Sequence, residues 1–257
     1  MAITALPTGP TRTPFDPERL TALLYGHPKI GRTTFCAQIP SALFIATEPG
    51  QAHVTCAKVD VASWADFLDA CKLIKAGGHP YRTIVIDVVD KLWEMCAASI
   101  CAKNNVTHES DLSYGKGTSL ITAEFQRTIS FLCQLGYGVW FVSHVEQREF
   151  DTQTGKVQMW VPGMARKCFQ VVNRIVDVVA FADIEREMVD RVKEPGAVNV
   201  ELHRRVLRLT PGKYHVAGNR FGKLPDTVPL DYNAFRSALI KVVEGDGETK
   251  PTTKTKE

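Results

Sequence analysis

The sequence predicts an α/β domain with a mostly parallel sheet, helices on both faces of the sheet, and a β-hairpin insertion. Short apolar runs alternate along the chain with segments whose apolar residues have helical spacing. The clearest strand is Thr83–Val89, whose continuous β-branched run is typical of a strand covered on both faces. The turn-rich segment Asp151–Lys156 lies between two extended arms and predicts the hairpin.

The remaining elements follow from apolar patterns and from turn residues at their ends. The first strand is expected at Leu20–Tyr25 and is followed, after a glycine-containing loop, by a helix starting at Thr33. Further strands are expected at Ala42–Ala46, His53–Val61, Gly136–Val145, Val176–Ala182 and Val206–Leu209. Helices are expected at Ser63–Ala76, Asp90–Lys103, Ser119–Leu135, Ala165–Arg174 and Leu230–Val243, with Asn104–Gly117 as a polar loop.

The organisation expected along the chain is one domain over residues 18–244. A Pro- and Thr-rich flexible arm is expected at 1–17, and a polar, disordered tail at 245–257. The 257 residues suffice to bury a core without disulfides or metals. The formal net charge of +3 is too small to indicate nucleic-acid binding by itself.

Cysteine usage and hydropathy indicate a cytoplasmic protein. The seven cysteines are scattered, form no CxxC pair and mostly lie in apolar runs, so we expect reduced thiols and no zinc site. No run approaches about 18 continuous apolar residues, so no membrane span is expected.

A phosphate-binding loop is predicted between the first strand and the first helix. The pattern G-x-x-x-x-G-K-[ST] matches at every fixed position except the lysine, which is Arg32. The residues expected to bind nucleotide are Gly26, His27, Pro28, Lys29, Ile30, Gly31, Arg32, Thr33 and Thr34. A guanidinium is broader than an ammonium, so Arg32 can still bind phosphate yet fits the loop less well. The alternative is an accidental Gly/Thr turn before a helix.

Thr33 and Asp87 are the predicted ligands of Mg²⁺. Thr33 occupies the loop position whose hydroxyl binds the ion, and Asp87 ends the buried run Thr83–Ile86 at the sheet edge where ligands bind. The alternative role for Asp87 is a helix N-cap. Asp90 could serve as that cap instead, which would leave Asp87 free for the metal.

Glu48 and His144 follow two further strands and are candidate catalytic residues together with Arg32. Glu48 lies just past the strand Ala42–Ala46, where a general base for water attack could reach the γ-phosphate. His144 lies at the tip of the strand that contains Val139–Val142, where a polar side chain could sense that phosphate. The alternatives are a solvated loop acid for Glu48 and a structural histidine for His144.

The order of these pieces resembles the RecA and recombinase ATPases. More closely, the chain is similar to the RecA-like "AAA domain" nucleotide-binding proteins of bacteriophages, the Sak-type single-strand recombination ATPases. The segments that carry the resemblance are Gly26–Thr34, Phe44–Gly50, Thr83–Asp87, Phe141–His144 and Gly218–Pro225. The resemblance covers about residues 20–240 and implies a RecA-like P-loop NTPase with ATP and Mg²⁺ as cofactors.

The resemblance also implies roles outside the phosphate loop. Glu48 would be the catalytic base, His144 the sensor, and Arg220 a charge that reaches a neighbouring subunit's nucleotide in a homo-oligomeric filament or ring. The segments Asn104–Gly117 and Gln147–Gly163 would take the places of DNA-binding loops.

The second of these segments contains the candidate DNA-binding residues. They are Arg148, Phe150, Lys156 and Trp160, because charge combined with aromatic stacking suits single-stranded DNA. The alternatives are a solvated hairpin with ordinary packing of its arms and, for Arg220, a surface arginine in a turn.

Three functions compete at this point. The first is a DNA-dependent ATPase that acts on single-stranded DNA in phage recombination or replication, with a single-strand-binding protein as a possible partner. The second is a nucleotide-binding scaffold or switch that does not hydrolyse ATP, which Arg32 favours. The third is another P-loop enzyme, such as a helicase loader or a nucleotide kinase. A kinase would need an arginine-rich lid, whereas Arg204, Arg205 and Arg208 have spacing that fits alternate faces of a strand.

Overall fold

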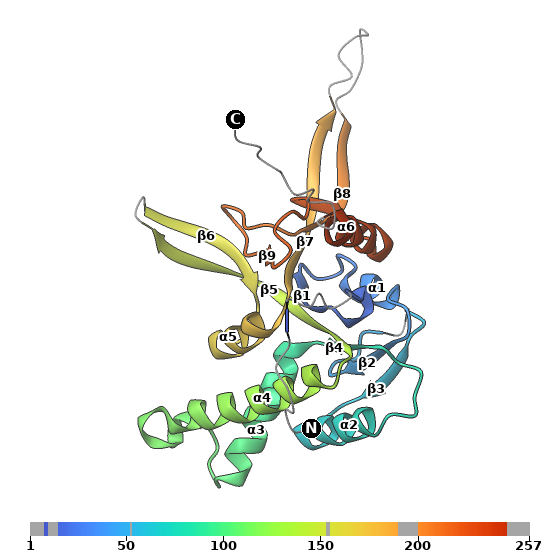
Figure 1. The fold of residues 1–257 in the computed structure, drawn as a ribbon. Coiled ribbons are helices and arrows are strands. Elements are labelled where there is room, and N and C mark those ends of the chain that lie inside the picture. The colour runs from blue at the N-terminus through green and yellow to red at the C-terminus, as the bar shows by residue number, and fades with distance from the viewer. Residues whose placement is uncertain (1–7, 10–14, 52, 153–154, 190–199, 246–257) are drawn as a thin grey trace, which may run out of the picture.

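A computed structural model describes residues 8–9, 15–51, 53–152, 155–189 and 200–245 of the chain. The predicted arm at 1–17 and tail at 245–257 therefore lie almost wholly outside the described residues. Within the described residues, ten strands form one sheet in the order β10-β8-β7-β1-β5-β4-β2-β3, with β6 paired to β5 and β9 paired to β7. Figure 1 shows this sheet running through the molecule, with the β5–β6 and β7–β8 hairpins projecting from it.

The central strands are parallel, and helices or loops connect them. These strands are β1 (Thr21–Gly26), β2 (Ala42–Ala46), β3 (Ala57–Asp60), β4 (Thr83–Asp87), the first part of β5 (Gly138–Thr152) and the first part of β7 (Val178–Val189). β1 lies between β5 and β7, with Gly26 opposite His144 on one side and Ala182 on the other. The predicted α/β fold with a mostly parallel sheet is therefore confirmed.

Antiparallel strands extend this core on both sides of the site. β5 continues into the predicted hairpin with β6 (Gly155–Pro162), in which Asp151 pairs with Lys156. β7 pairs with β8 (Val200–Arg208) and with the short strand β9 (Gly218–Asn219), and β8 pairs with β10 (Thr227–Pro229). The sequence did not predict β9 or β10.

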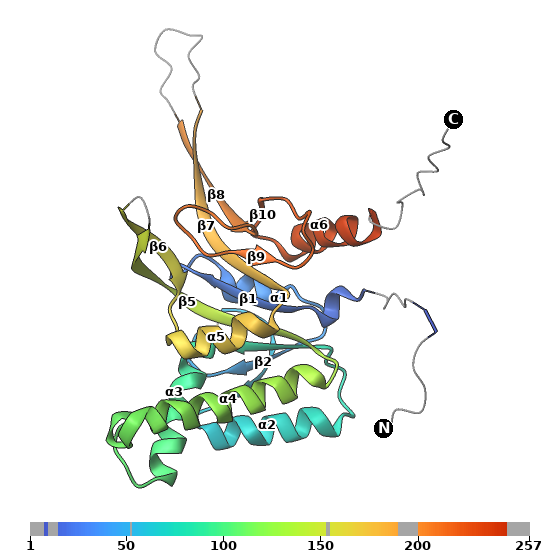
Figure 2. The ribbon, with the colours of Figure 1, turned by 60° about the vertical axis from the view of Figure 1, so that its left-hand side comes forward.

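The helices cover both faces of the sheet, as the buried clusters show. One cluster joins the sheet to α2 (Trp64–Ala76), α3 (Val89–Lys103), α4 (Lys116–Gln134) and α5 (Arg166–Ile175). The other cluster joins the opposite face to α1 (Arg32–Ala37) and α6 (Tyr232–Gly245). Figure 2 shows α2, α4 and α5 on one side of the sheet and α6 on the other. Alternation along β1 accounts for the two clusters, because Leu23 and Tyr25 belong to the first and Ala22 and Leu24 to the second.

Several predicted boundaries differ from the structure for local reasons. The strand predicted to reach Val89 ends at Asp87, because α3 begins at Val89. The segment predicted as a loop before Ser119 contains the 3₁₀ turns η2 (Glu109–Asp111) and η3 (Ser113–Gly115), and α4 already starts at Lys116. A further 3₁₀ turn, η1 (Pro17–Arg19), precedes β1. The predicted strand His53–Val61 is reduced to β3.

The cysteines of the described residues are all free. Cys36, Cys71, Cys96, Cys101 and Cys168 are buried, whereas Cys56 and Cys133 are partly exposed. Burial raises the pKa of the Cys36 and Cys168 thiols well above its usual value, so both behave as apolar core residues.

Candidate functional site

The phosphate loop connects the buried end of β1 to α1. A Cβ on Gly26 would lie 2.6 Å from the carbonyl oxygen of Ala182, so only glycine allows β1 and β7 to approach this closely. Farther along the loop, Lys29 and Gly31 have φ values of 65° and 113°. The glycine at position 31 suits this left-handed backbone, and α1 begins at the next residue.

The loop lines an open pocket of about 420 Å³. A pocket of this size suits a nucleotide-sized ligand. Its lining residues are Lys29, Gly31, Arg32, Thr33, Thr34, Gly50, His53 and Arg205. Four other predicted loop residues, Gly26, His27, Pro28 and Ile30, are not among them. The loop therefore lines the pocket mainly with the residues from Gly31 to Thr34.

Thr33 and Asp87 meet at the edge of the sheet. The Thr33 hydroxyl donates a hydrogen bond of 3.0 Å to Asp87 Oδ2, and the Gln51 side-chain amide donates one of 3.1 Å to the same oxygen. Asp87 is only 5% exposed. Neither acid caps α3, because the N-cap residue is Val88 and the Asp90 carboxylate bonds to His144 instead. The helix-cap alternatives for Asp87 and Asp90 are therefore wrong.

This pair suits a magnesium ion by its chemistry. A hydroxyl and a carboxylate are hard oxygen ligands, and Mg²⁺ commonly takes only one or two protein ligands and completes its shell with phosphate and water. Within the described residues, no group of three or more His, Cys, Asp or Glu side chains could hold a metal by itself.

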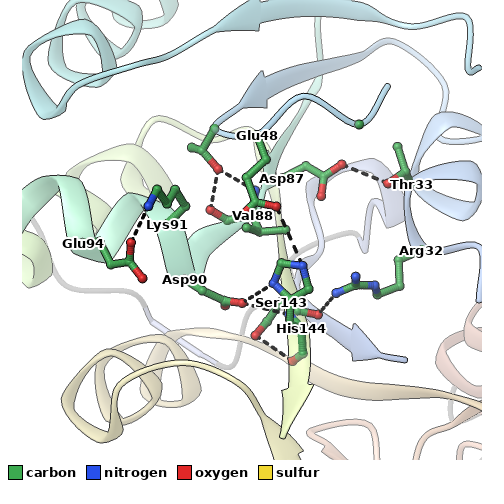
Figure 3. Close-up of polar contacts among 12 residues, drawn as sticks. Arg32, Thr33, Glu48, Asp87, Val88, Asp90, Lys91, Glu94, Ser143 and His144 are labelled. Atoms are coloured by element: carbon green, nitrogen blue, oxygen red, sulfur yellow. Dashed lines mark hydrogen bonds and ion pairs between the residues drawn. The ribbon is translucent and has the colours of Figure 1, made fainter. Parts of the chain in front are cut away.

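Arg32 extends from the start of α1 toward Ser143 in the interior of β5. Its Nη1 donates a hydrogen bond to the main-chain carbonyl of Ser143 (Figure 3). Burial lowers the pKa of the Arg32 guanidinium, while the carboxylates of Asp87, Asp90 and Glu48 act in the opposite direction. An arginine remains charged under these influences, so Arg32 contributes a cation that is already tied to β5.

Glu48, His144 and Asp90 form a chain of polar contacts beside Arg32. His144 Nδ1 lies 2.9 Å from Asp90 Oδ2, and the His144 main-chain N–H donates to that same oxygen at 2.9 Å. On the other side of the ring, Nε2 lies 3.8 Å from Glu48 Oε2 (Figure 3). The hydrogen bond to Asp90 raises the pKa of His144, although burial and Arg32 oppose it. The structure therefore brings both predicted residues together and adds Asp90.

The position of Glu48 is set by its neighbour Thr47. The Thr47 hydroxyl accepts a hydrogen bond of 2.7 Å from the Val88 N–H and donates one of 2.8 Å to the Val88 carbonyl. The Thr47 N–H also donates to the Asp87 carbonyl at 3.0 Å. These bonds join the end of β2 to the end of β4, so Glu48 and Asp87 are held at one edge.

The sequence and the fold of this chain are similar to those of known proteins. A family model described as "AAA domain" matches residues 18–221, which is most of the chain. The chain belongs to the AAA domain family. No curated protein matches it. Among solved structures, it is similar to a KaiC-like protein from the hyperthermophilic archaeon Pyrococcus horikoshii OT3, at 16% identity and a TM-score of 0.45, over 83% of this chain and 85% of that chain.

Family membership agrees with the geometry of the loop. An AAA domain with a phosphate loop, a lined pocket and a Thr–Asp pair has the parts of a P-loop nucleotide site. In the described residues, no helix has both the length and the apolar character needed to cross a membrane.

The four DNA-binding candidates of this AAA domain are not gathered on one surface. Phe150 is 41% exposed on the β5 arm of the hairpin. Trp160 lies at the base instead, where its ring meets His27 of the phosphate loop at 4.7 Å between centroids. Arg148 is paired with Glu146 at 2.8 Å and also donates to a main-chain carbonyl, and Lys156 is paired with Glu149 at 2.6 Å.

Arg220 lies far from its own phosphate loop along the sheet. It is paired with Asp177 at 3.2 Å and donates to the Arg174 carbonyl at 2.7 Å. Asp177 directly precedes β7, and Thr21 at the start of β1 donates to its carboxylate. The parallel strands begin at this edge, whereas the predicted nucleotide-binding residues lie at the opposite edge of the parallel part of the sheet.

Several residues at the site escaped the sequence analysis. Thr47, Gln51 and His53 lie in or beside the loop after β2, and a polar run after a predicted strand was the only available signal. Asp90 was considered only as a cap. Arg205 was noticed in an arginine cluster, but its place in the pocket depends on how β8 packs beside β7.

Proposed function

We propose that the chain binds ATP with Mg²⁺ and hydrolyses it. The observation that carries this proposal is the contact between Thr33 and Asp87, which are 54 positions apart yet lie within 3.0 Å beside the phosphate-loop pocket. Thr33 and Asp87 would hold the Mg²⁺ ion, which would neutralise charge on the phosphates when bound.

The residues around the pair supply the rest of the chemistry in this proposal. Glu48 would accept the proton of the attacking water, and the Thr47 bonds to Val88 keep it at the sheet edge. His144, held by Asp90 and facing Glu48, would report the state of the site to β5. Arg32 would stabilise negative charge on the phosphates.

A nucleotide-binding protein without turnover is the competing proposal. It is favoured by Arg32, because its guanidinium donates to the Ser143 carbonyl and is broader than the compact ammonium of the lysine in the motif. Glu48 and Asp87 favour hydrolysis, because a site that only binds has no need of a base beside the metal ligand.

The deciding experiment measures ATP binding and Mg²⁺-dependent hydrolysis on the same purified sample. Turnover supports the ATPase, and binding without turnover supports the scaffold or switch. The variant Arg32→Lys sharpens the result. A gain in turnover of about tenfold or more shows that the guanidinium limits the native site, while an unchanged or lower rate shows that the site is adapted to Arg32.

We infer further that single-stranded DNA is the partner of this ATPase. The continuity of β5 supports this inference. β5 carries His144 at the site and continues without interruption into the hairpin that bears Arg148 and Phe150. DNA on the hairpin would therefore act on the strand that contacts Glu48. The resemblance to Sak-type proteins supports a role in phage recombination, a homo-oligomeric filament or ring, and a single-strand-binding protein as partner.

The DNA proposal is tested by adding a single-stranded oligonucleotide to the hydrolysis assay at several salt concentrations. Stimulation of turnover, with binding that falls steeply as salt increases, supports it. Duplex DNA of the same sequence serves as the control. An equal response to duplex, or no response to either, contradicts a single-strand-dependent ATPase.

A further inference from the structure

We propose that Arg205 is a phosphate-binding residue of the nucleotide site and acts on the nucleotide of its own chain. This inference rests on the proposed binding of ATP. It assigns to β8, which lies outside the phosphate-loop motif, a phosphate-binding cation in addition to Arg32, which stands where the motif has lysine.

The first support is the position of the side chain. A Cβ placed on Gly31 would lie 3.5 Å from Arg205 Nη1, so the guanidinium reaches the turn of the phosphate loop. Arg205 also lines the 420 Å³ pocket together with Lys29 and Thr33. These contacts lie within one chain.

The second support is how firmly the main chain at this position is held. Arg205 pairs with Ile184 of β7, and its carbonyl accepts a hydrogen bond of 3.0 Å from the Leu230 N–H. Two residues later, Leu207 is fully buried in the cluster that contains Phe35 of α1. Because side chains two apart on a strand point to the same face, Arg205 faces the side on which α1 and the phosphate loop lie.

The third support is that the guanidinium is available. Among the described residues, Arg205 has no hydrogen bond or ion pair through its side chain. Other arginines nearby are engaged: Arg208 pairs with Asp183 at 2.7 Å, and Arg32 donates to the Ser143 carbonyl. Arg205 is exposed to the pocket and can therefore bind a ligand without first breaking a contact.

The chemistry of the group fits a phosphate. A guanidinium presents five N–H donors in a planar fork and binds two phosphate oxygens at once. Lys29 lies on the same pocket and adds a second cation. Arg32 approaches the pocket from the start of α1, whereas Arg205 and Lys29 would meet the phosphates from β8 and from the loop.

The test compares Arg205→Gln, Arg205→Lys and the control Arg204→Gln. Arg204 lies next to Arg205 on β8 and points to the opposite face, so its variant removes the same charge from the same strand. Binding of ATP, ADP, AMP and adenosine is measured by calorimetry with Mg²⁺. We expect Arg205→Gln to weaken binding of ATP about tenfold or more and to leave adenosine binding unchanged, with partial rescue by lysine.

The outcomes separate this inference from the function on which it rests. Wild-type protein that binds no ATP overturns both. Wild-type binding with equal ATP affinity in Arg205→Gln overturns the inference alone, as does an equal loss in Arg204→Gln. A mixture of Arg205→Gln with Asp87→Ala tests the same-chain assignment, because recovery of turnover in the mixture would show that Arg205 acts on a neighbouring subunit's nucleotide.

Discussion

The sheet edge at the phosphate loop and the β5–β6 hairpin share a strand but are built differently. At the edge, Asp87 and Thr47 are buried and bonded to residues from other strands and loops. On the hairpin, Arg148 and Lys156 are paired with glutamates of the same hairpin, and the Lys156 side chain is 67% exposed.

The difference shows that the sheet edge is arranged in advance for a ligand, whereas the hairpin is not. At the edge, the bonds cross between segments and fix the positions of the proposed catalytic groups before any ligand arrives, as the proposed hydrolysis would require. On the hairpin, each cation is neutralised by a near neighbour, so a polyanion must displace a carboxylate to reach it. Exposed pairs of this kind contribute little stability and can exchange partners.

The largest expected effect is at Glu48. Glu48→Gln removes the predicted base but keeps the side-chain size, so we expect turnover to fall about 10²- to 10⁴-fold while ATP affinity stays within a few fold. Steady-state hydrolysis and calorimetry check this. Glu94→Gln, an exposed glutamate of α3 paired with Lys91, is the matched control. A similar loss in both variants would rule out a specific role for Glu48.

The second effect is at Asp87 and concerns binding. Asp87→Ala removes the carboxylate that meets Thr33 and leaves the Gln51 amide without its partner. We expect Mg²⁺-dependent ATP affinity to fall about 10- to 100-fold, with a smaller change when Mg²⁺ is omitted. Titrations with and without Mg²⁺ measure this, and Asp69→Asn on the surface of α2 is the control. If Glu48→Gln and Asp87→Ala lose binding equally, the two assigned roles are wrong.

The third effect tests the hairpin separately from the edge. Phe150→Ala removes an exposed aromatic ring, so we expect affinity for single-stranded DNA to fall about fivefold or more, while ATP affinity is unchanged. Fluorescence anisotropy with a labelled oligonucleotide measures it. Phe131→Ala on α4 removes another partly exposed ring and is the control. Unchanged DNA affinity in Phe150→Ala would remove stacking from the DNA proposal.

The smallest effect is a pH dependence of stability from His144. Its pKa is raised by Asp90, with Glu48 acting in the same direction and Arg32 and burial against it. The stabilisation is therefore complete below about pH 6.5 and is lost as pH rises through the higher pKa of the folded state. We expect the difference in Tm between wild type and His144→Gln to shrink over that interval. A difference that does not vary with pH would show that His144 gains no proton affinity from Asp90.

The sequence predicted the parts of the fold that local patterns specify. The buried run that begins at Thr83 forms a strand within its predicted bounds, and the turn-rich segment Asp151–Lys156 forms the predicted hairpin. Glu48, Asp87 and His144 were predicted at strand ends, and the parallel pairing brings the ends of β2 and β4 to one edge. His144 lies opposite Gly26 at that edge, but it is not at a strand end, because β5 continues to Thr152.

The remaining features depend on contacts between distant segments, for which one sequence carries no signal. The pairing of Asp90 with His144 spans 54 positions, and Trp160 of the β5–β6 hairpin packs on His27 of the phosphate loop. The spacing of Arg204 and Arg205 predicted alternate faces of a strand. It could not show which face meets the phosphate loop, because β8 reaches the loop only through its pairing with β7.

Because β1 lies between β5 and β7, the chain cannot be truncated before β7 without exposing one edge of β1. The sequence motifs of the nucleotide site fall within residues 26–144, so a truncation after the β5–β6 hairpin would keep them and lose only Arg205 from the pocket lining. It would also remove β7 and leave the Ala22–Gly26 main chain as an open edge, with the fully buried Leu24 uncovered on the side of the missing helix α6. An exposed apolar edge strand pairs with other chains, so such a fragment would aggregate.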